Sequence, residues 1–276
     1  MDGSTPGLGF SHLVCHCLLI ETEQGLVLVD TGFGLQDVNK PHDRLAEFFL
    51  YFNNVQLIEE KTAAAQVEKL GFKREDVRHI VMTHLDFDHA GGISDFPNAT
   101  VHIFEAEYRA AMVAKSLKDV GRYRPQQWAR IKEWQRYEVG GDLWNGFESV
   151  RDLKGLPPEI LMVPLVGHTF GHCGIAVDNG TEWLFHAGDA YFFRDEMDVE
   201  NPRCPIGLRA YQTGMEVDRH LRLHNQDRLR NLKRGLGEDL TIFCAHDRVE
   251  LERLQARQGQ RIEKVEPGFL HGSVHY

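Results

Sequence analysis

Residues 83–92, THLDFDHAGG, place four potential metal ligands within six positions. These side chains are His84, Asp86, Asp88 and His89. Imidazole nitrogens and carboxylate oxygens are ligands that zinc, iron and manganese accept in proteins. This stretch therefore predicts a divalent metal site rather than an ordinary surface loop.

Three distant segments carry the same residue types, namely GHTFGH (167–172), HAGDA (186–190) and CAHD (244–247). Each follows an apolar run that is typical of a buried strand. In α/β sheets, the loops at the carboxyl ends of strands usually carry the functional groups. If these strands lie side by side, all four loops converge at one edge of the sheets and build a single site.

Apolar runs and turn residues predict strands within 12–32, where two strands flank a turn at Gln24 and Gly25, and within 79–84, 99–104, 160–172, 174–189 and 240–247. Helices are expected over 43–52, 59–70 and about 216–234, and residues 105–137 also have a largely helical pattern. The tail from about residue 250 is polar and weakly patterned. Because strands followed by helices recur in both halves, we predict one domain of helix-covered sheets over residues 1–276.

The composition limits the function classes. The chain has 276 residues and a formal net charge of -10, which disfavours nucleic acid as a main partner. We find no apolar segment long enough to span a membrane and no secretory signal pattern at the start. Five cysteines without a Cys-x-x-Cys motif argue against a disulfide framework, so we expect a cytoplasmic protein. We also expect the substrate to be a small molecule. A homodimer is left open.

The ordered set of motifs, from LVLVDTG (26–32) to CAHD, resembles the metallo-β-lactamase superfamily along nearly the whole chain. The resemblance implies an αββα sandwich of two mixed β-sheets flanked by helices, here with a helical insertion at about 105–158. It also implies two divalent metal ions, zinc first and iron or manganese as alternatives. By position, His84, Asp86 and His168 would hold the first metal, Asp88, His89 and His246 the second, and Asp189 would bridge them.

The same resemblance implies hydrolysis by a metal-bridging hydroxide, which Asp88 would help to orient. Asp30 would brace the 84–89 loop from outside the ligand set. The second histidine of the GHTFGH loop, His172, would have a supporting role, whereas His186 could be either such a support or a core residue. A solvated helix face is the better interpretation of the pair at His220 and His224.

Asp86 departs from the family pattern, which has histidine at this position. One more negative charge should weaken the Lewis acidity at the first metal and favour harder ions such as iron or manganese. Flavodiiron proteins in the superfamily look similar in having a carboxylate there, although the carboxylate is a glutamate. Their activity is not carried over, because the chain is too short for the appended flavodoxin-like domain of those proteins. A non-hydrolytic di-iron redox or metal-binding protein on the same fold is kept as a separate alternative.

Acyl-homoserine lactonases are similar to the chain in their loops and in the Ala-His-Asp ending. We therefore expect a lactone substrate of the acyl-homoserine type, with thioester or β-lactam hydrolysis as the alternative. Tyr191, two residues after Asp189, is a candidate oxyanion donor, and Phe192 and Phe193 would form an apolar wall. The stretch RYRPQQWARIKEWQRY (122–137) either caps the site with arginines and tryptophans or packs as an amphipathic helix on the sheet.

Overall fold

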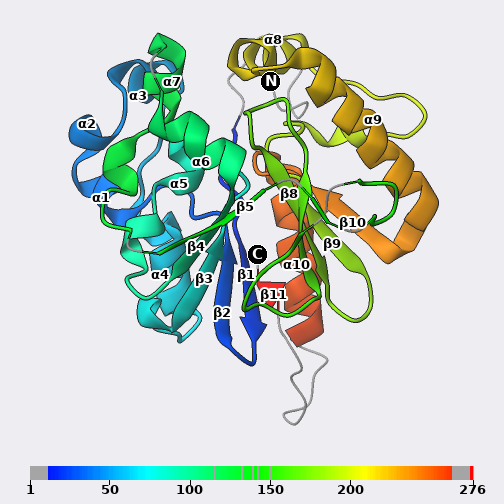
Figure 1. Ribbon diagram of the computed structural model, residues 1–276, viewed down its shortest axis with the longest axis horizontal. Helices are drawn as coiled ribbons and strands as arrows, with labels where there is room; N and C mark the ends of the chain where they lie inside the picture. The colour runs from blue at the N-terminus through cyan, green and yellow to red at the C-terminus, as the bar shows by residue number, and fades with distance from the viewer. Residues whose placement is uncertain are drawn as a thin grey trace.

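The computed structural model describes residues 12–262, except residues 115, 132, 139, 142, 149 and 150, together with residues 274 and 275. Two mixed sheets face each other, and helices cover their outer faces, as in the predicted αββα sandwich (Figure 1). The first sheet has the order β11 (Val274–His275), β1 (Leu18–Thr22), β2 (Gly25–Val29), β3 (Val77–Val81), β4 (Thr100–Phe104) and β5 (Trp134–Tyr137). The second has the order β10 (Leu240–Phe243), β9 (Trp183–His186), β8 (Cys173–Asp178), β7 (Ile160–Pro164) and β6 (Arg151–Asp152).

Strands β2 to β5 run parallel, as do β9 and β10, whereas β1 pairs with β2 in the antiparallel direction around the predicted turn. The helices are α1 (Leu35–Asn39), α2 (Pro41–Arg44), α3 (Glu47–Phe52), α4 (Ala63–Lys69), α5 (Phe87–Ala90), α6 (Glu105–Met112), α7 (Leu117–Arg122), α8 (Ile206–Met215), α9 (Arg219–Leu236) and α10 (Arg248–Ile262). Single 3₁₀ turns lie at Glu59–Lys61, Arg74–Asp76, Ile93–Asp95, Pro125–Gln127, Arg194–Met197 and Gly237–Asp239. None of the described helices is both long enough and apolar enough to cross a membrane.

Apolar side chains that point to alternate faces of the strands form three apolar layers. In β2, Val27 and Val29 enter the layer between the two sheets, while Leu26 and Leu28 enter the layer under the helices of the first sheet. Successive strand side chains point to opposite faces, so a strand that is apolar at every position is buried on both sides. The third layer joins the second sheet to α9 through Leu229 and Leu232.

Helix α4 shows how the local sequence sets the element. The Thr62 side chain accepts a hydrogen bond from the Ala65 backbone nitrogen at 3.2 Å and so caps the first turn. Ala64 and Val67 fall on the buried face, as their spacing predicts. Gly71, with φ +93°, follows the helix in the left-handed region that glycine adopts without strain.

The segment from 105 to 137 is less helical than expected. Helices α6 and α7 occupy its first part, but Trp134–Tyr137 forms β5, which pairs in parallel with β4. Trp128 is buried and Trp134 half-buried in the apolar layer under the first sheet's helices, so both pack on the sheet rather than line the site. Pairing with an existing strand edge has overridden the helical pattern here.

Two other elements differ from expectation. Helix α10 covers residues whose polar, weakly patterned sequence does not indicate a helix, and its Leu254 enters the layer between the sheets. Helix α8, which precedes α9, was not predicted. Figure 1 places α8 at the same end of the molecule as α3 and α7, above the sheets.

Candidate metal centre

The 84–89 loop begins where β3 ends, and Asp30 at the end of the neighbouring β2 fixes its position. The carboxylate of Asp30 accepts hydrogen bonds from the backbone nitrogen and the hydroxyl of Thr83 at 2.8 and 2.7 Å. Its Oδ2 atom also lies 2.8 Å from Nδ1 of His89, which leaves Nε2 of that ring to face the site. The predicted bracing role of Asp30 is therefore visible in its contacts.

The donor atoms predicted for the first metal lie at tetrahedral spacing. The Oδ2 atom of Asp86 lies 3.1 Å from His168 Nε2 and 3.6 Å from His84 Nε2. The Oδ2 atom of Asp189 lies 3.3 and 3.8 Å from the same two nitrogens. Zinc bonds of about 2.1 Å in tetrahedral directions separate neighbouring donors by about 3.4 Å. The spacing of these four donor atoms thus suits one divalent ion.

The donor atoms predicted for the second metal use the other oxygen of Asp189. Its Oδ1 atom lies 3.2 Å from His89 Nε2 and 3.1 Å from His246 Nε2. The same nitrogen of His246 lies 3.7 Å from Asp88 Oδ2. His246 Nε2 also lies 3.2 Å from Asp189 Oδ2, so this ring faces both oxygens of the carboxylate. Asp189 therefore lies between the two groups of histidines, in a position that suits a residue shared by two metals.

Several of these buried atoms have no hydrogen-bond partner within the described part of the chain. They include Nε2 of His84, Nε2 of His89 and Oδ1 of Asp189, and the second oxygen of Asp86, Oδ1, also lacks a partner. A buried polar atom without a partner costs about 1–3 kcal/mol. Because unpaired donor atoms from distant loops point at one another, the set fits metal ions better than it fits a hydrogen-bonded core.

Two histidines hold the backbone at Gly188 and Asp189. His172 Nε2 accepts a hydrogen bond from the Asp189 backbone nitrogen at 2.8 Å, and His172 Nδ1 donates to the Leu165 carbonyl at 2.9 Å. His186 accepts from the Gly188 nitrogen at 3.2 Å and donates to the His16 carbonyl at 2.7 Å. His172 thus has the supporting role that was predicted, and His186 combines the two roles left open for it.

Charge and burial set the protonation of this group. Burial raises the pKa of Asp189, but His246, His89 and His168 outweigh it and hold that pKa well below its usual range. Burial also lowers the pKa of His172 well below its usual value. Asp189 is therefore anionic, while His172 is neutral and can accept the backbone proton.

Glycines 91 and 92 allow another segment to approach the loop closely. A Cβ atom on Gly91 would lie 2.1 Å from Asp37 Oδ2, and one on Gly92 would lie 2.8 Å from the Thr31 carbonyl oxygen. Neither residue has a positive φ angle, so contact rather than backbone conformation requires glycine. The approaching segment is the turn after β2 together with Asp37 of α1.

The insertion contributes two buried charged residues to the surroundings of the site. Arg122 belongs to the stretch that could cap the site with arginines, whereas no sequence motif indicated Glu107. Arg122, at the end of α7, is fully buried, and its Nη2 atom lies 2.7 Å from Asp86 Oδ2. Glu107 of α6 is also fully buried and accepts hydrogen bonds from the backbone nitrogens of Leu85 and Gly171, each at 3.0 Å. Glu107 thereby ties the 84–89 loop to the 167–172 loop.

The prediction for Tyr191 does not match its position. Its hydroxyl donates to the Glu250 carboxylate at 3.0 Å, within an apolar cluster on the outer side of the second sheet. Tyr211 of α8 lies nearer the metal centre, because its ring packs 5.9 Å from Phe192, whose ring lies 4.6 Å from that of His246. Burial raises the pKa of Tyr211 and the charge of Asp88 adds to it, so the phenol stays protonated.

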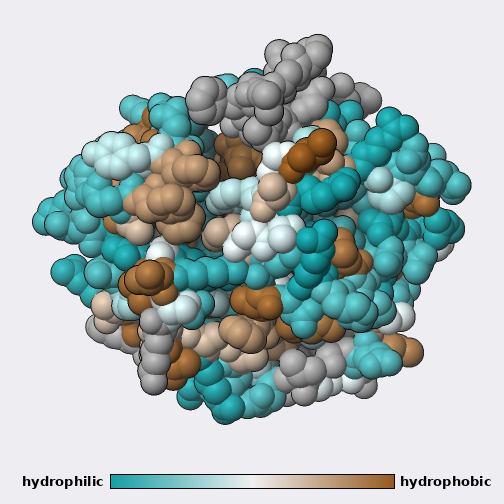
Figure 2. All heavy atoms as spheres, turned by 90° about the horizontal axis from the view of Figure 1, so that it is seen from above, coloured by the Kyte–Doolittle hydropathy of each residue, from teal (hydrophilic) through white to brown (hydrophobic). Residues whose placement is uncertain are grey.

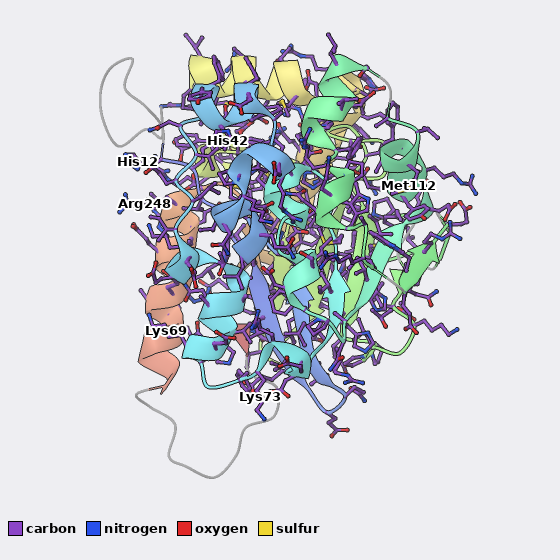
Figure 3. All side chains as sticks on the ribbon, turned by 90° about the vertical axis from the view of Figure 1, so that its left-hand side faces the viewer. His12, His42, Lys69, Lys73, Met112 and Arg248 are labelled. Carbon is purple, nitrogen blue, oxygen red and sulfur yellow. The ribbon has the colours of Figure 1, made fainter. Side chains whose placement is uncertain are left out.

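Of the other residues considered, Phe192 lies beside the centre and the rest lie away from it. Phe192 forms the expected apolar wall, whereas the ring of Phe193 packs under the Arg194 guanidinium at 4.6 Å. His220 and His224 are exposed on α9, as the solvated-face interpretation predicts. His12 is exposed at the edge of the molecule, near Arg248 (Figure 3).

Comparison with known proteins gives a consistent result. A family model described as the Metallo-beta-lactamase superfamily matches residues 11–246. A probable metallo-hydrolase of Mycobacterium tuberculosis is 44% identical over 235 residues, which cover 85% of this chain and 75% of that protein. An N-acyl homoserine lactonase of a Bacillus species is 37% identical over 239 residues, or 86% of this chain and 82% of the lactonase.

The fold also matches a solved structure of an N-acyl homoserine lactone hydrolase, which has the product N-hexanoyl-L-homoserine bound at its catalytic metal centre. The TM-score is 0.65 at 23% identity, and the alignment covers 91% of this chain and 88% of that one. At this level of identity the match shows the shared fold.

Proposed function

Because the chain belongs to the metallo-β-lactamase superfamily of metal-dependent hydrolases, we propose that it opens the ester ring of a small lactone at a centre of two divalent metal ions. The observation that carries the proposal is the position of Asp189 between two donor groups. Its Oδ2 atom lies near His84 and His168, its Oδ1 atom lies near His89, and both oxygens lie near His246. The lactonase relative, aligned over most of both chains, supports the choice of substrate.

Two bound divalent ions would supply an activated water molecule and would polarise the ester carbonyl. The residues of this chain provide the positions around them. Asp88 is the most open of the ligand side chains, 21% exposed, so it stands where a substrate would enter. We assign it the orientation of the attacking water.

Tyr211 is the candidate donor to the substrate carbonyl. Its hydroxyl accepts a hydrogen bond from Asn53 Nδ2 at 3.2 Å, and no described residue takes its own proton. A neutral phenol can then donate to the oxygen on which negative charge develops. This assignment replaces Tyr191 in the role expected from the sequence.

Helices α3 and α8 add an apolar surface beside the loop. Phe49 of α3 packs against Phe87 of α5 at 4.6 Å between ring centroids, so α3 lies over the helix that carries Asp88 and His89. On the outer side of α3 and α8, large apolar side chains remain exposed, namely Phe48, Tyr51, Phe52 and Ile206. Figure 2 looks onto this end of the molecule and shows hydrophobic residues among the hydrophilic ones. Such a surface favours a lactone with an acyl chain over a bare ring.

A substrate panel tests the proposal. The zinc- and manganese-loaded protein is given acyl-homoserine lactones of two chain lengths, an unsubstituted γ-lactone, an acyl thioester and a β-lactam, and acid release is followed. We expect the longer acyl-homoserine lactone to give the highest kcat/KM. Asp189→Asn protein and free metal serve as controls. Turnover of the thioester or the β-lactam alone would overturn the lactone assignment.

Elemental analysis of protein purified without added metal addresses the redox alternative. A hydrolase should contain zinc or manganese, or remain active with them after exchange. About two irons per chain, with a visible band that responds to a reductant and no hydrolysis of any ester, would instead identify a di-iron protein.

A further inference from the structure

We propose that Arg122 and Asp86 act as one unit at the first metal position, where Asp86 supplies the ligand oxygen and Arg122 the charge that balances it. The pair then carries the net charge of a neutral histidine, so the first site is as suited to zinc as a site with three histidines. This inference rests on the proposed metal centre and adds Arg122 to it as a positioning and charge-balancing residue.

The described hydrogen bonds of Arg122 are with two residues of the first donor group, Asp86 and His168. The Nη2 atom lies 2.7 Å from Asp86 Oδ2 and 3.0 Å from His168 Nε2, and Nη1 donates to the His168 carbonyl at 3.3 Å. The guanidinium is fully buried, and the backbone of the next residue, Tyr123, bridges to that of Asp86. The end of α7 therefore holds a permanent positive charge against one ligand oxygen.

The guanidinium lies outside the four donor atoms and not among them. A group at the centre of that tetrahedron would be about 2.1 Å from Asp189 Oδ2 as well as from Asp86 Oδ2. Arg122 forms an ion pair with Asp86, whereas the described ion pairs of Asp189 are with His84, His89, His168 and His246. The guanidinium thus stands behind the edge between Asp86 and His168 and leaves the metal position to an ion.

This geometry changes what Asp86 should do. Considered alone, a carboxylate in place of histidine adds a negative charge and favours harder ions. The Arg122 guanidinium lies 2.7 Å from Asp86 Oδ2, so its positive charge cancels the extra negative charge of Asp86 next to the metal position. Either residue without the other leaves a buried charge unbalanced, which is the costly arrangement for an ion pair. The two positions should therefore tolerate a joint change better than either single change.

A cycle of four proteins tests this dependence: wild type, Arg122→Met, Asp86→His, and the double variant. For each we would measure zinc per chain by elemental analysis, zinc affinity against a chelator, and the rise in Tm of apo-protein on adding zinc. Asp86→His leaves the arginine charge beside the metal, so zinc affinity at the first site should fall about 10- to 100-fold. The double variant should recover to within about threefold of wild type.

Arg122→Met alone leaves Asp86 as an unbalanced buried carboxylate. Its apo-protein should unfold at a lower temperature than wild type, and zinc should raise that temperature by more than in wild type. Arg122→Lys keeps the charge and should behave like wild type in zinc affinity. Arg222→Met is the matched control, because it breaks another buried ion pair, with Glu216 at 2.6 Å, and should lower Tm without changing zinc stoichiometry.

Each outcome decides the matter. Recovery in the double variant supports the paired role. Additive losses in the double variant, or equal zinc-induced Tm shifts in wild type and Arg122→Met, would show that Arg122 only fills space. One zinc in wild type and two in Arg122→Met would show that the guanidinium takes the metal position. Wild-type protein that binds no metal and hydrolyses nothing would instead reject the proposed function.

Discussion

The Nε2 atom of His172 accepts a hydrogen bond from the backbone nitrogen of Asp189 at 2.8 Å, while its Nδ1 donates to the Leu165 carbonyl. A histidine outside both donor groups thus fixes the residue that serves both of them. The contact also sets the tautomer of His172, since only a neutral ring with its proton on Nδ1 satisfies both partners.

Replacing this histidine should therefore disturb metal binding from a distance. In His172→Ala, the Asp189 backbone nitrogen loses its acceptor, and we expect zinc affinity to fall by about 10- to 100-fold. Competition with a chelator measures the change. The exposed His220→Ala is the control and should bind zinc as wild type does. Unchanged affinity in His172→Ala would remove the supporting role.

Glu107 should matter for metal binding as much as a metal ligand does, although it contacts none of the atoms proposed to bind the metals. Its two oxygens accept from Leu85 and Gly171, and an amide in its place can accept at only one of them. Glu107→Gln should lower both zinc affinity and kcat/KM by about tenfold or more. Measuring both matters, because a fall in Tm with normal metal binding would mean that Glu107 supports the fold alone.

The two tyrosines should separate catalysis from stability. Tyr211→Phe should lower kcat by about 100-fold with little change in metal content, because a donor to the developing charge is lost. Tyr191→Phe should leave kcat near wild type and lower the free energy of unfolding by about 1–3 kcal/mol, since Glu250 loses a buried partner. The opposite pattern of kcat values would restore Tyr191 to the site and exclude Tyr211.

A pH dependence of stability should come from outside the metal centre. Burial, with a smaller contribution from His79, lowers the pKa of His102 from 6.5 to about 3. Below pH 6.5, His102 binds a proton in the unfolded chain but stays neutral in the folded chain. The contribution of His102 to the free energy of unfolding is therefore present above that pH and is lost as pH falls toward 3. The slope from this one residue approaches about 1.4 kcal/mol per pH unit.

Urea unfolding at several pH values measures the effect. His102→Asn replaces the titrating ring by a neutral polar group that can still reach Tyr137, whose hydroxyl lies 2.8 Å from His102 Nδ1. Between pH 6.5 and 4, stability should fall less steeply in the variant than in wild type. Parallel curves for the two proteins would show that His102 does not titrate as its burial requires.

The candidate ligands could be found in the sequence because each lies in a loop that follows an apolar strand. His84 to His89, His168, Asp189 and His246 come directly after apolar strands, and strand ends meet at one edge whatever covers the sheets. The supports Asp30 and His172 lie in the same strand-end motifs. The residue patterns predicted that these loops would converge at one edge of the sheets. The αββα fold and the assignment of ligands to two metals came from the resemblance that these ordered motifs carry.

The contributions of Arg122 and Glu107 could not be predicted in the same way. Both come from helices of the insertion, where a charged residue normally indicates a solvated face, and only the packing of α6 and α7 onto the loops buries them. β5 was missed for a related reason, since its strand state depends on the edge of β4. The prediction that Tyr191 is an oxyanion donor was wrong, because the sequence position does not show that this side chain points into the outer apolar layer.

Zinc titration of the apo-protein, followed by Tm and by lactone turnover in the same samples, tests the central claim most directly. We predict that both signals saturate at two zinc ions per chain, and that Asp189→Asn neither binds the pair nor turns over substrate. Saturation of both signals at a single ion, or a fully loaded protein that opens no lactone above the rate of free zinc, would contradict the account.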